Sequence, residues 1–191
     1  MENTSAVVQA LLKEKPAVAV LLDHAVVKGL LRKFDRTAEP DYSKIVAHFR
    51  ARFPDCTVTV YDGRPYTDPN ALCHSDDENR RLAARENLWA SVTAAGAVVR
   101  VCRTVKEGER YVRRGLETLI AVDVLDTYID ADRFYVVMQG PDSEPAVEAA
   151  RNDGQKFVSI DLVPSCLARD GLAEHEQFTP ETAKAWTGAK S

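Results

Sequence analysis

Short apolar runs alternate with longer amphipathic segments along this chain. Five runs rich in Val and Ile, each close to Pro, Gly or Asp, have the length and composition of buried strands: residues 17–22, 56–61, 97–102, 134–138 and 157–162. Segments with helical spacing of apolar residues include 42–53, 78–95, 115–128 and 145–152. The alternation predicts an α/β fold, a three-layer sandwich in which a mainly parallel five-stranded sheet carries helices on both faces.

The pattern predicts one domain over residues 1–178 and a weakly ordered C-terminal tail over 179–191, in which Trp186 is exposed or docks on the domain. Residues 1–15 have the apolar spacing of a short amphipathic helix. Residues 63–75 hold two Pro and several other turn formers, so we expect a long loop after the second strand.

Composition narrows the class of protein. With 191 residues, 45% of them hydrophobic and 28% charged, the chain is typical of a folded soluble protein. It has no apolar run near the roughly 20 residues of a membrane span and no recognisable export signal, so we expect a cytoplasmic location and no membrane partner. The four Cys lie far apart without a C-x-x-C pair, which favours reduced thiols over a zinc site.

Carboxylates stand where the predicted strands end. Asp23 and Asp62 each close an apolar run, Asp142 follows the fourth run, and Glu117 and Asp123 lie in the helix before it. Ligands of open parallel sheets bind at the carboxyl ends of the strands, where converging carboxylates suit Mg²⁺ or Mn²⁺. The alternative is that these acids cap helices or face water. Phosphate-binding glycine motifs and the G-x-S-x-G elbow are missing from the sequence.

Several segments resemble the NYN family of PIN-like nuclease domains, which includes LabA-type proteins. The similarity covers residues 17–23, VTVYDG at 58–63, the helix 79–96, RGLETLIAVDVL at 114–125, YVVMQGPDSEPAV at 135–147 and DGQKFV at 153–158. The resemblance implies an endoribonuclease dependent on Mg²⁺ or Mn²⁺ that hydrolyses phosphodiester bonds in RNA. It implies catalytic roles for Asp23, Glu117, Asp123 and Asp142, with Asp23, Glu117 and Asp142 as metal ligands.

Some positions depart from the family pattern. Val26 stands where the family has Asn, and a Val side chain can neither ligate a metal nor bind a phosphate. Aligning on Gly140 puts Pro141 at the position of an acid, whereas aligning on Pro145 keeps Asp142 at the cost of a one-residue deletion. The second hypothesis is therefore a catalytically inactive NYN-like module that binds RNA or a protein.

A basic run precedes the acidic helix. Lys106, Arg113 and Arg114 are the candidates for binding the RNA backbone, and Tyr66 or Tyr111 is free to stack on an unpaired base. The formal charge of −4 means that RNA binding would depend on such a local patch, and the alternative is a solvated loop. His24 either lines the cleft as a proton carrier or is a satisfied structural histidine. A third alternative is a structural subunit of a larger assembly, either a homo-oligomer or a complex with a protein partner, with residues 1–15 and the tail around Trp186 as contacts.

Overall fold

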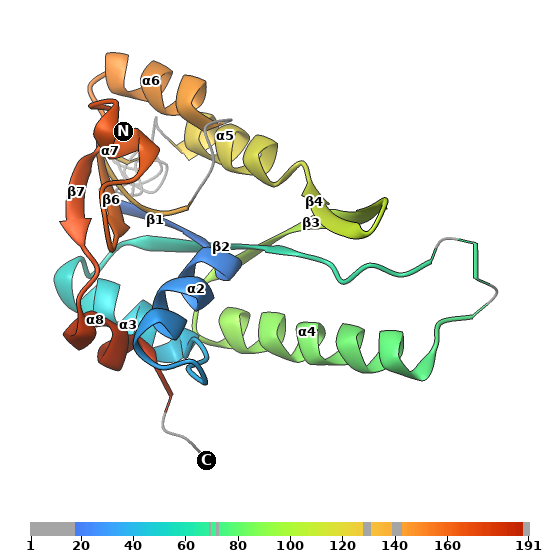
Figure 1. Cartoon of the computed structure of the whole chain (residues 1–191). Coiled ribbons are helices and arrows are strands. Elements are labelled where there is room, and N and C mark those ends of the chain that lie inside the picture. Colours follow the sequence, from blue (N-terminus) through green and yellow to red (C-terminus); the bar gives the residue numbers. More distant parts are fainter. Residues whose placement is uncertain (1–17, 69, 72, 128–130, 139–142, 189–191) are drawn as a thin grey trace, which may run out of the picture.

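The chain folds into a sheet with helices on both faces (Figure 1). The computed structural model describes residues 18–68, 70–71, 73–127, 131–138 and 143–188. The elements are β1 (Val18–Asp23), α2 (His24–Phe34), α3 (Tyr42–Arg52), β2 (Thr57–Gly63), α4 (Asp76–Ala94), β3 (Val98–Glu107), β4 (Arg110–Arg114), α5 (Leu116–Thr127), β5 (Arg133–Val137), α6 (Glu144–Asn152), β6 (Lys156–Asp161), α7 (Cys166–Arg169), β7 (Glu174–Gln177) and α8 (Pro180–Trp186).

The strands have the order β4-β3-β2-β1-β5-β6-β7, and every neighbouring pair is parallel except the antiparallel β3–β4 hairpin. This confirms the predicted α/β fold with a mainly parallel sheet. The predicted number of five strands is wrong, because β4 and β7 extend the sheet at its two edges. Their sequences, RYVRR and EHEQ, lack the apolar runs of buried strands, since an edge strand is half solvated.

Two apolar layers hold the helices on the sheet. Because side chains alternate along a strand, Val20 and Leu22 of β1 face α2, α3, α4 and α8, whereas Ala19 and Leu21 face α5, α6 and α7. All six residues of β1 are buried, as in the central strand of a covered parallel sheet. The polar residue that ends β1, Asp23, follows the alternation and lies on the same side as Leu21.

The segment expected as a weakly ordered tail after residue 179 is folded as far as residue 188. Thr179 caps α8, and its hydroxyl accepts a hydrogen bond from the amide of Thr182 (3.2 Å). Trp186 is fully buried and packs on Phe49 and Phe178, with ring centroids 5.7 and 5.2 Å away. The aromatic side chain therefore anchors the end of the chain to the domain, which corrects the predicted tail.

Three further expectations concern the helix at residues 1–15, membrane-spanning segments and the cysteines. The helix expected at residues 1–15 lies outside the described residues. None of the helices in the described ranges combines the length and apolar character that a membrane crossing needs. All four cysteines are free: Cys56 and Cys102 are buried, Cys166 is half-buried and Cys73 is exposed.

Candidate functional site

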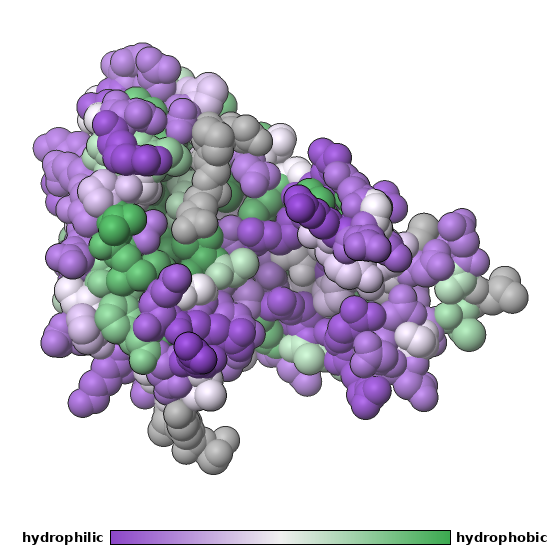
Figure 2. Space-filling model, viewed as in Figure 1, coloured by the Kyte–Doolittle hydropathy of each residue, from purple (hydrophilic) through white to green (hydrophobic). Residues whose placement is uncertain are grey.

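A cleft of about 690 Å³ lies at the carboxyl ends of β1 and β2. Its walls are α4 and the β3–β4 hairpin, and Figure 1 shows these two elements on opposite sides of the end of β2. The start of α2 and the end of β2 form its floor. Four cationic and two acidic side chains line it: Lys28, Arg81, Arg85, Arg113, Glu39 and Asp62. Figure 2 shows that hydrophilic side chains dominate the surface of α4 and the hairpin. The cleft therefore has the excess of cations that an anionic ligand requires.

α4, which forms one wall of the cleft, is stabilised more by its N-terminal cap than by contacts with the hydrophobic core. The hydroxyl of Ser75 accepts a hydrogen bond from the amide of Glu78 (3.2 Å), and the carboxylate of Glu78 accepts one from the amide of Ser75 (2.8 Å). This capping box starts the helix. Val92 is the only fully buried residue among the nineteen of α4. The helix therefore projects from the sheet and presents Arg81 and Arg85 to the cleft.

Asp23, at the end of β1, forms an ion pair with Arg113, which lines the cleft. Arg113 Nη1 donates to Asp23 Oδ1 at 2.6 Å, and Nη2 donates to Oδ2 at 2.9 Å. The amide of Ala25 also donates to Asp23 Oδ1 (2.9 Å), so Asp23 caps α2. Burial alone lowers the pKa of Arg113, but the hydrogen bonds and charge of Asp23 outweigh it and raise that pKa above its usual value. Both oxygens of Asp23, which is only 1% exposed, thus accept hydrogen bonds from a fixed guanidinium.

The stem of Arg113 lies directly on Gly63. A Cβ atom built on Gly63 would stand 2.8 Å from Cγ and 2.9 Å from Cδ of Arg113, closer than carbon atoms approach without displacement. Glycine at the end of β2 therefore lets β4 place its arginine across the cleft floor.

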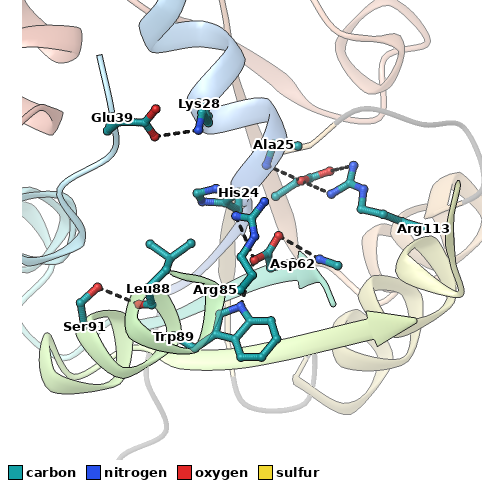
Figure 3. A network of polar contacts seen from close by, with 12 residues as sticks. His24, Ala25, Lys28, Glu39, Asp62, Arg85, Leu88, Trp89, Ser91 and Arg113 are labelled. Carbon is teal, nitrogen blue, oxygen red and sulfur yellow. Dashed lines mark hydrogen bonds and ion pairs between the residues drawn. The ribbon is translucent and has the colours of Figure 1, made fainter. Parts of the chain in front are cut away.

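Asp62 holds a second arginine from the opposite wall. Trp89 Nε1 donates to Asp62 Oδ2 at 2.9 Å, and Arg85 Nη1 lies 3.3 Å from the same oxygen. The other oxygen accepts a hydrogen bond from the amide of Gly63 (2.8 Å). Asp62 is 3% exposed, so this buried carboxylate ties α4 to the end of β2 and orients Arg85 (Figure 3).

His24 begins α2 beside these groups. Its Nδ1 is 2.9 Å from the hydroxyl of Tyr42, and both side chains are buried. Burial is the main cause that lowers the pKa of His24 to about 4, and the positive charges of Arg85 and Lys28 add to it, while Asp62 and Asp23 oppose it. His24 is therefore neutral near pH 7, and such a weak base is poorly suited to accept a proton there.

We expect the fold to become less stable as the pH falls, because His24 binds a proton more readily in the unfolded chain. The unfolded His24 binds a proton near pH 6.5 but the folded one only near pH 4, so the free energy of unfolding drops by about 2 kcal/mol between pH 7.5 and 5 through this residue. Urea unfolding at both values would measure the drop, and His24→Gln should remove about that part of it. His48, whose pKa is also lowered by burial, remains in both proteins. An equal pH dependence in the two proteins would contradict the assignment.

Two tyrosines form the rim of the cleft. Tyr66 in the loop after β2 and Tyr111 in β4 lie with ring centroids 5.4 Å apart, and Tyr111 is 57% exposed. Tyr111 pairs in register with exposed Lys106 of β3, so both side chains lie on the face of the hairpin that carries Arg113. The alternative of a solvated loop is therefore wrong, because the segment forms a β-hairpin that presents aromatic and cationic groups on one face.

The candidate carboxylates are only partly brought together. Asp23 is buried at the end of β1 beneath Arg113. Asp123 of α5 lies elsewhere and accepts hydrogen bonds from Tyr61 Oη (2.9 Å) and from Arg100 Nη2 (3.0 Å). Glu117 is half-buried in the first turn of α5. Asp142 lies outside the described residues, together with Pro141.

The described residues do not fit a magnesium or manganese centre. Within the described ranges, no three His, Cys, Asp or Glu side chains gather where they could hold one ion. The oxygens of Asp23 and Asp123 are engaged by Arg113 and Arg100. The metal role of Asp142 stays a prediction.

The three candidate RNA-binding residues also differ in position. Arg113 lines the cleft and Lys106 is exposed on the hairpin, whereas Arg114 pairs with Glu107 across the hairpin. Side chains alternate along a strand, so Arg114 points to the face opposite Arg113.

Sequence reasoning missed the cluster of Asp62, Arg85 and Trp89. The sequence shows Asp62 as the end of a strand, but the helix that supplies its partners begins fourteen residues later, so no local spacing connects them. The signal within α4 is the separation of Arg85 and Trp89 by four residues, which puts both on one helical face.

A second hollow of about 650 Å³ lies on the other side of Arg113. Arg113 and Ala25 line both hollows, and Asp23, Val26, Lys33, Asp161 and Val163 are among the residues that line the second. Val26, which stands where the resembling family has Asn, packs against the apolar layer of α2. The Asp23–Arg113 pair thus separates the two hollows.

Comparison with known structures supports the fold. The chain is similar to the crystal structure of a protein of unknown function from Vibrio parahaemolyticus, with a TM-score of 0.62 and 15% identity over 92% of this chain and 98% of that chain. A structure of a Sir2 enzyme (TM-score 0.42, 11% identity, 96% of this chain and 97% of that chain) and a D,D-heptose 1,7-bisphosphate phosphatase from Burkholderia thailandensis (0.38, 12%, 87% and 95%) are too distant to show a common fold. No family model and no curated protein matches the chain.

Proposed function

We propose that this protein is an NYN-like module that binds single-stranded RNA in the cleft between α4 and the β3–β4 hairpin. The observation that carries the proposal is the combination of a cationic cleft with a rim of two tyrosines, Tyr66 and Tyr111. Proteins that bind single strands combine these two features, because cations follow the backbone while aromatic rings stack on bases.

The cations of the cleft suit a phosphodiester backbone. Arg113 and Arg85 approach from opposite walls, and each is oriented by a buried carboxylate (Figure 3). Each guanidinium keeps N–H donors beyond those that its carboxylate accepts, since arginine has five. A phosphate between the walls can therefore receive hydrogen bonds without breaking either ion pair.

The rim favours an unpaired base. Tyr111 is more than half exposed although it is aromatic, and it lies on the same face of the ribbon as Lys106. Bases of single-stranded loops and ends can be splayed onto such rings, whereas bases inside a duplex cannot.

Binding is better supported than hydrolysis. Cleavage of a phosphodiester by water needs a group that accepts the proton of the attacking water. Both oxygens of Asp23 are engaged by Arg113, and the pKa of His24 is about 4. Neither side chain is arranged as a general base, so we propose a binding module rather than an endoribonuclease.

We expect a fluorescein-labelled oligouridine to bind with an affinity that falls as salt increases, measured by fluorescence anisotropy. Tyr111→Ala should weaken binding about tenfold, because stacking on one aromatic ring contributes about 1–3 kcal/mol. Lys106→Ala should weaken binding less and reduce the salt dependence. Arg169→Ala, an exposed arginine of α7, is the control and should bind as the unchanged protein does.

Two results would decide against this proposal. If the unchanged protein and Tyr111→Ala bind equally, or if neither binds, the cleft is not a site for single-stranded RNA. Cleavage of the oligonucleotide with Mn²⁺ that disappears in Asp23→Asn would instead establish the endoribonuclease.

A further inference from the structure

A buried carboxylate at the end of a parallel strand requires a positive charge or several donors, because burying it unpaired is costly. At Asp23 the positive charge comes from within the chain. Both terminal nitrogens of Arg113 bond to the two oxygens in a fork, at 2.6 and 2.9 Å, and the amide of Ala25 supplies a third donor. These three donors occupy three of the roughly four lone-pair sites of the carboxylate, so little of Asp23 is left for a divalent ion.

Arg113 is held at both ends of its side chain. Its stem rests on Gly63, where a Cβ atom would lie 2.8 Å from Cγ, and its head is fixed by Asp23. A guanidinium fixed in this way is preorganised for its ligand, since it loses little conformational freedom on binding.

Arg113 still has donors to offer. Two of its five N–H groups bond to Asp23, and the side chain remains 30% exposed between the two hollows that it lines. The remaining donors can reach a phosphate oxygen in either hollow, and the charge of the guanidinium attracts that phosphate directly.

We propose that Arg113 is the resident cation of this site: it occupies on Asp23 the position that a divalent ion would need, and it binds the phosphodiester without metal. The proposal rests on the proposed function for its ligand, but the state of Asp23 can be tested without RNA. Asp23 is then a positioning residue, which holds Arg113 and does not contact the phosphate.

The first experiment measures binding of the labelled oligouridine with Mg²⁺ and with EDTA. The unchanged protein should bind at least as tightly with EDTA as with Mg²⁺, because added cations compete for the phosphates. Arg113→Ala should lose about tenfold or more in EDTA, as expected for a lost charge-assisted contact, and should regain part of it with Mn²⁺. Loss of binding by the unchanged protein in EDTA would overturn the proposal.

The second experiment needs no RNA and therefore separates this inference from the proposed function. Thermal melting of the unchanged protein should not respond to Mn²⁺, because Arg113 covers Asp23. The melting temperature of Arg113→Ala should rise with Mn²⁺, since a ligand that binds only the folded state stabilises it. The double variant Arg113→Ala with Asp23→Asn should lose that response.

A milder variant protects the test against misfolding of Arg113→Ala. Gly63→Ala introduces the Cβ atom that displaces the arginine stem, at a backbone conformation that alanine can adopt. It should weaken oligouridine binding and introduce a small response to Mn²⁺. A response to Mn²⁺ in the unchanged protein that Asp23→Asn removes would overturn the proposal, and so would Arg113→Ala or Gly63→Ala that folds yet shows no response.

Discussion

Trp186→Ala is expected to lower the free energy of unfolding by about 3–5 kcal/mol, the usual cost of truncating a large buried aromatic residue. The Trp186 ring is fully buried and lies within 6.0 Å, centroid to centroid, of His48, Phe49 and Phe178. These residues come from α3 and from the segment between β7 and α8. Truncation would therefore leave a cavity under α8 and release the end of the chain.

Urea unfolding followed by circular dichroism measures this loss. The matched control is Lys184→Ala on the same helix, where the side chain is exposed and alanine keeps the helix propensity. That control should change stability by no more than about 0.5 kcal/mol. If Trp186→Ala unfolds at the same urea concentration as Lys184→Ala, α8 is not anchored by its tryptophan.

Arg113→Met is the second substitution with a large expected effect, a loss of about 3–5 kcal/mol. Methionine keeps much of the apolar stem over Gly63 but removes the charge, so that the buried carboxylate of Asp23 loses its partner. Combining it with Asp23→Asn should restore part of the stability, because the buried charge is then also removed.

Arg114→Met provides the control on the same strand. Its partner Glu107 is exposed, and the pair lies on the surface, where ion pairs contribute about 0–1 kcal/mol. Equal losses in Arg113→Met and Arg114→Met, measured by urea unfolding, would show that burial of Asp23 does not set the strength of its ion pair.

The sequence predicts the centre of this fold better than its edges. The apolar runs of β1, β2, β5 and β6 are predicted correctly because these strands are covered on both faces or nearly so. β3 is also a strand, but it is not the buried strand that the sequence predicts, since only Cys102 of its ten residues is buried. β4 and β7 are not predicted, because an edge strand is partly solvated and its sequence therefore lacks an apolar run. α8 is not predicted for a different reason: its packing on the domain depends on one Trp side chain, which contacts residues that include some far away in sequence.

The sequence predicts several residues of the site but not which of them form ion pairs with one another. The sequence correctly places Asp23 at the end of a strand. It also points to Arg113 and Tyr111, which line the cleft, as members of a basic and aromatic run. It cannot show that Arg113 forms its ion pair with Asp23, ninety residues away, because the contact depends on the antiparallel return of β4. The resemblance implies that Asp23 binds a metal ion, whereas the fold shows that Asp23 is paired with Arg113.

The slight burial of α4 has a consequence for dynamics. A helix with one fully buried residue in nineteen, held by its cap and by contacts of Trp89 and Arg85 with Asp62, has little tertiary free energy to lose when it opens. Segments of this kind exchange their amide hydrogens through local openings, far below the free energy of global unfolding. The first half of α4, which carries Arg81, can thus fray and reform while the seven-stranded sheet stays intact, so that one wall of the cleft adapts to its ligand and the floor does not.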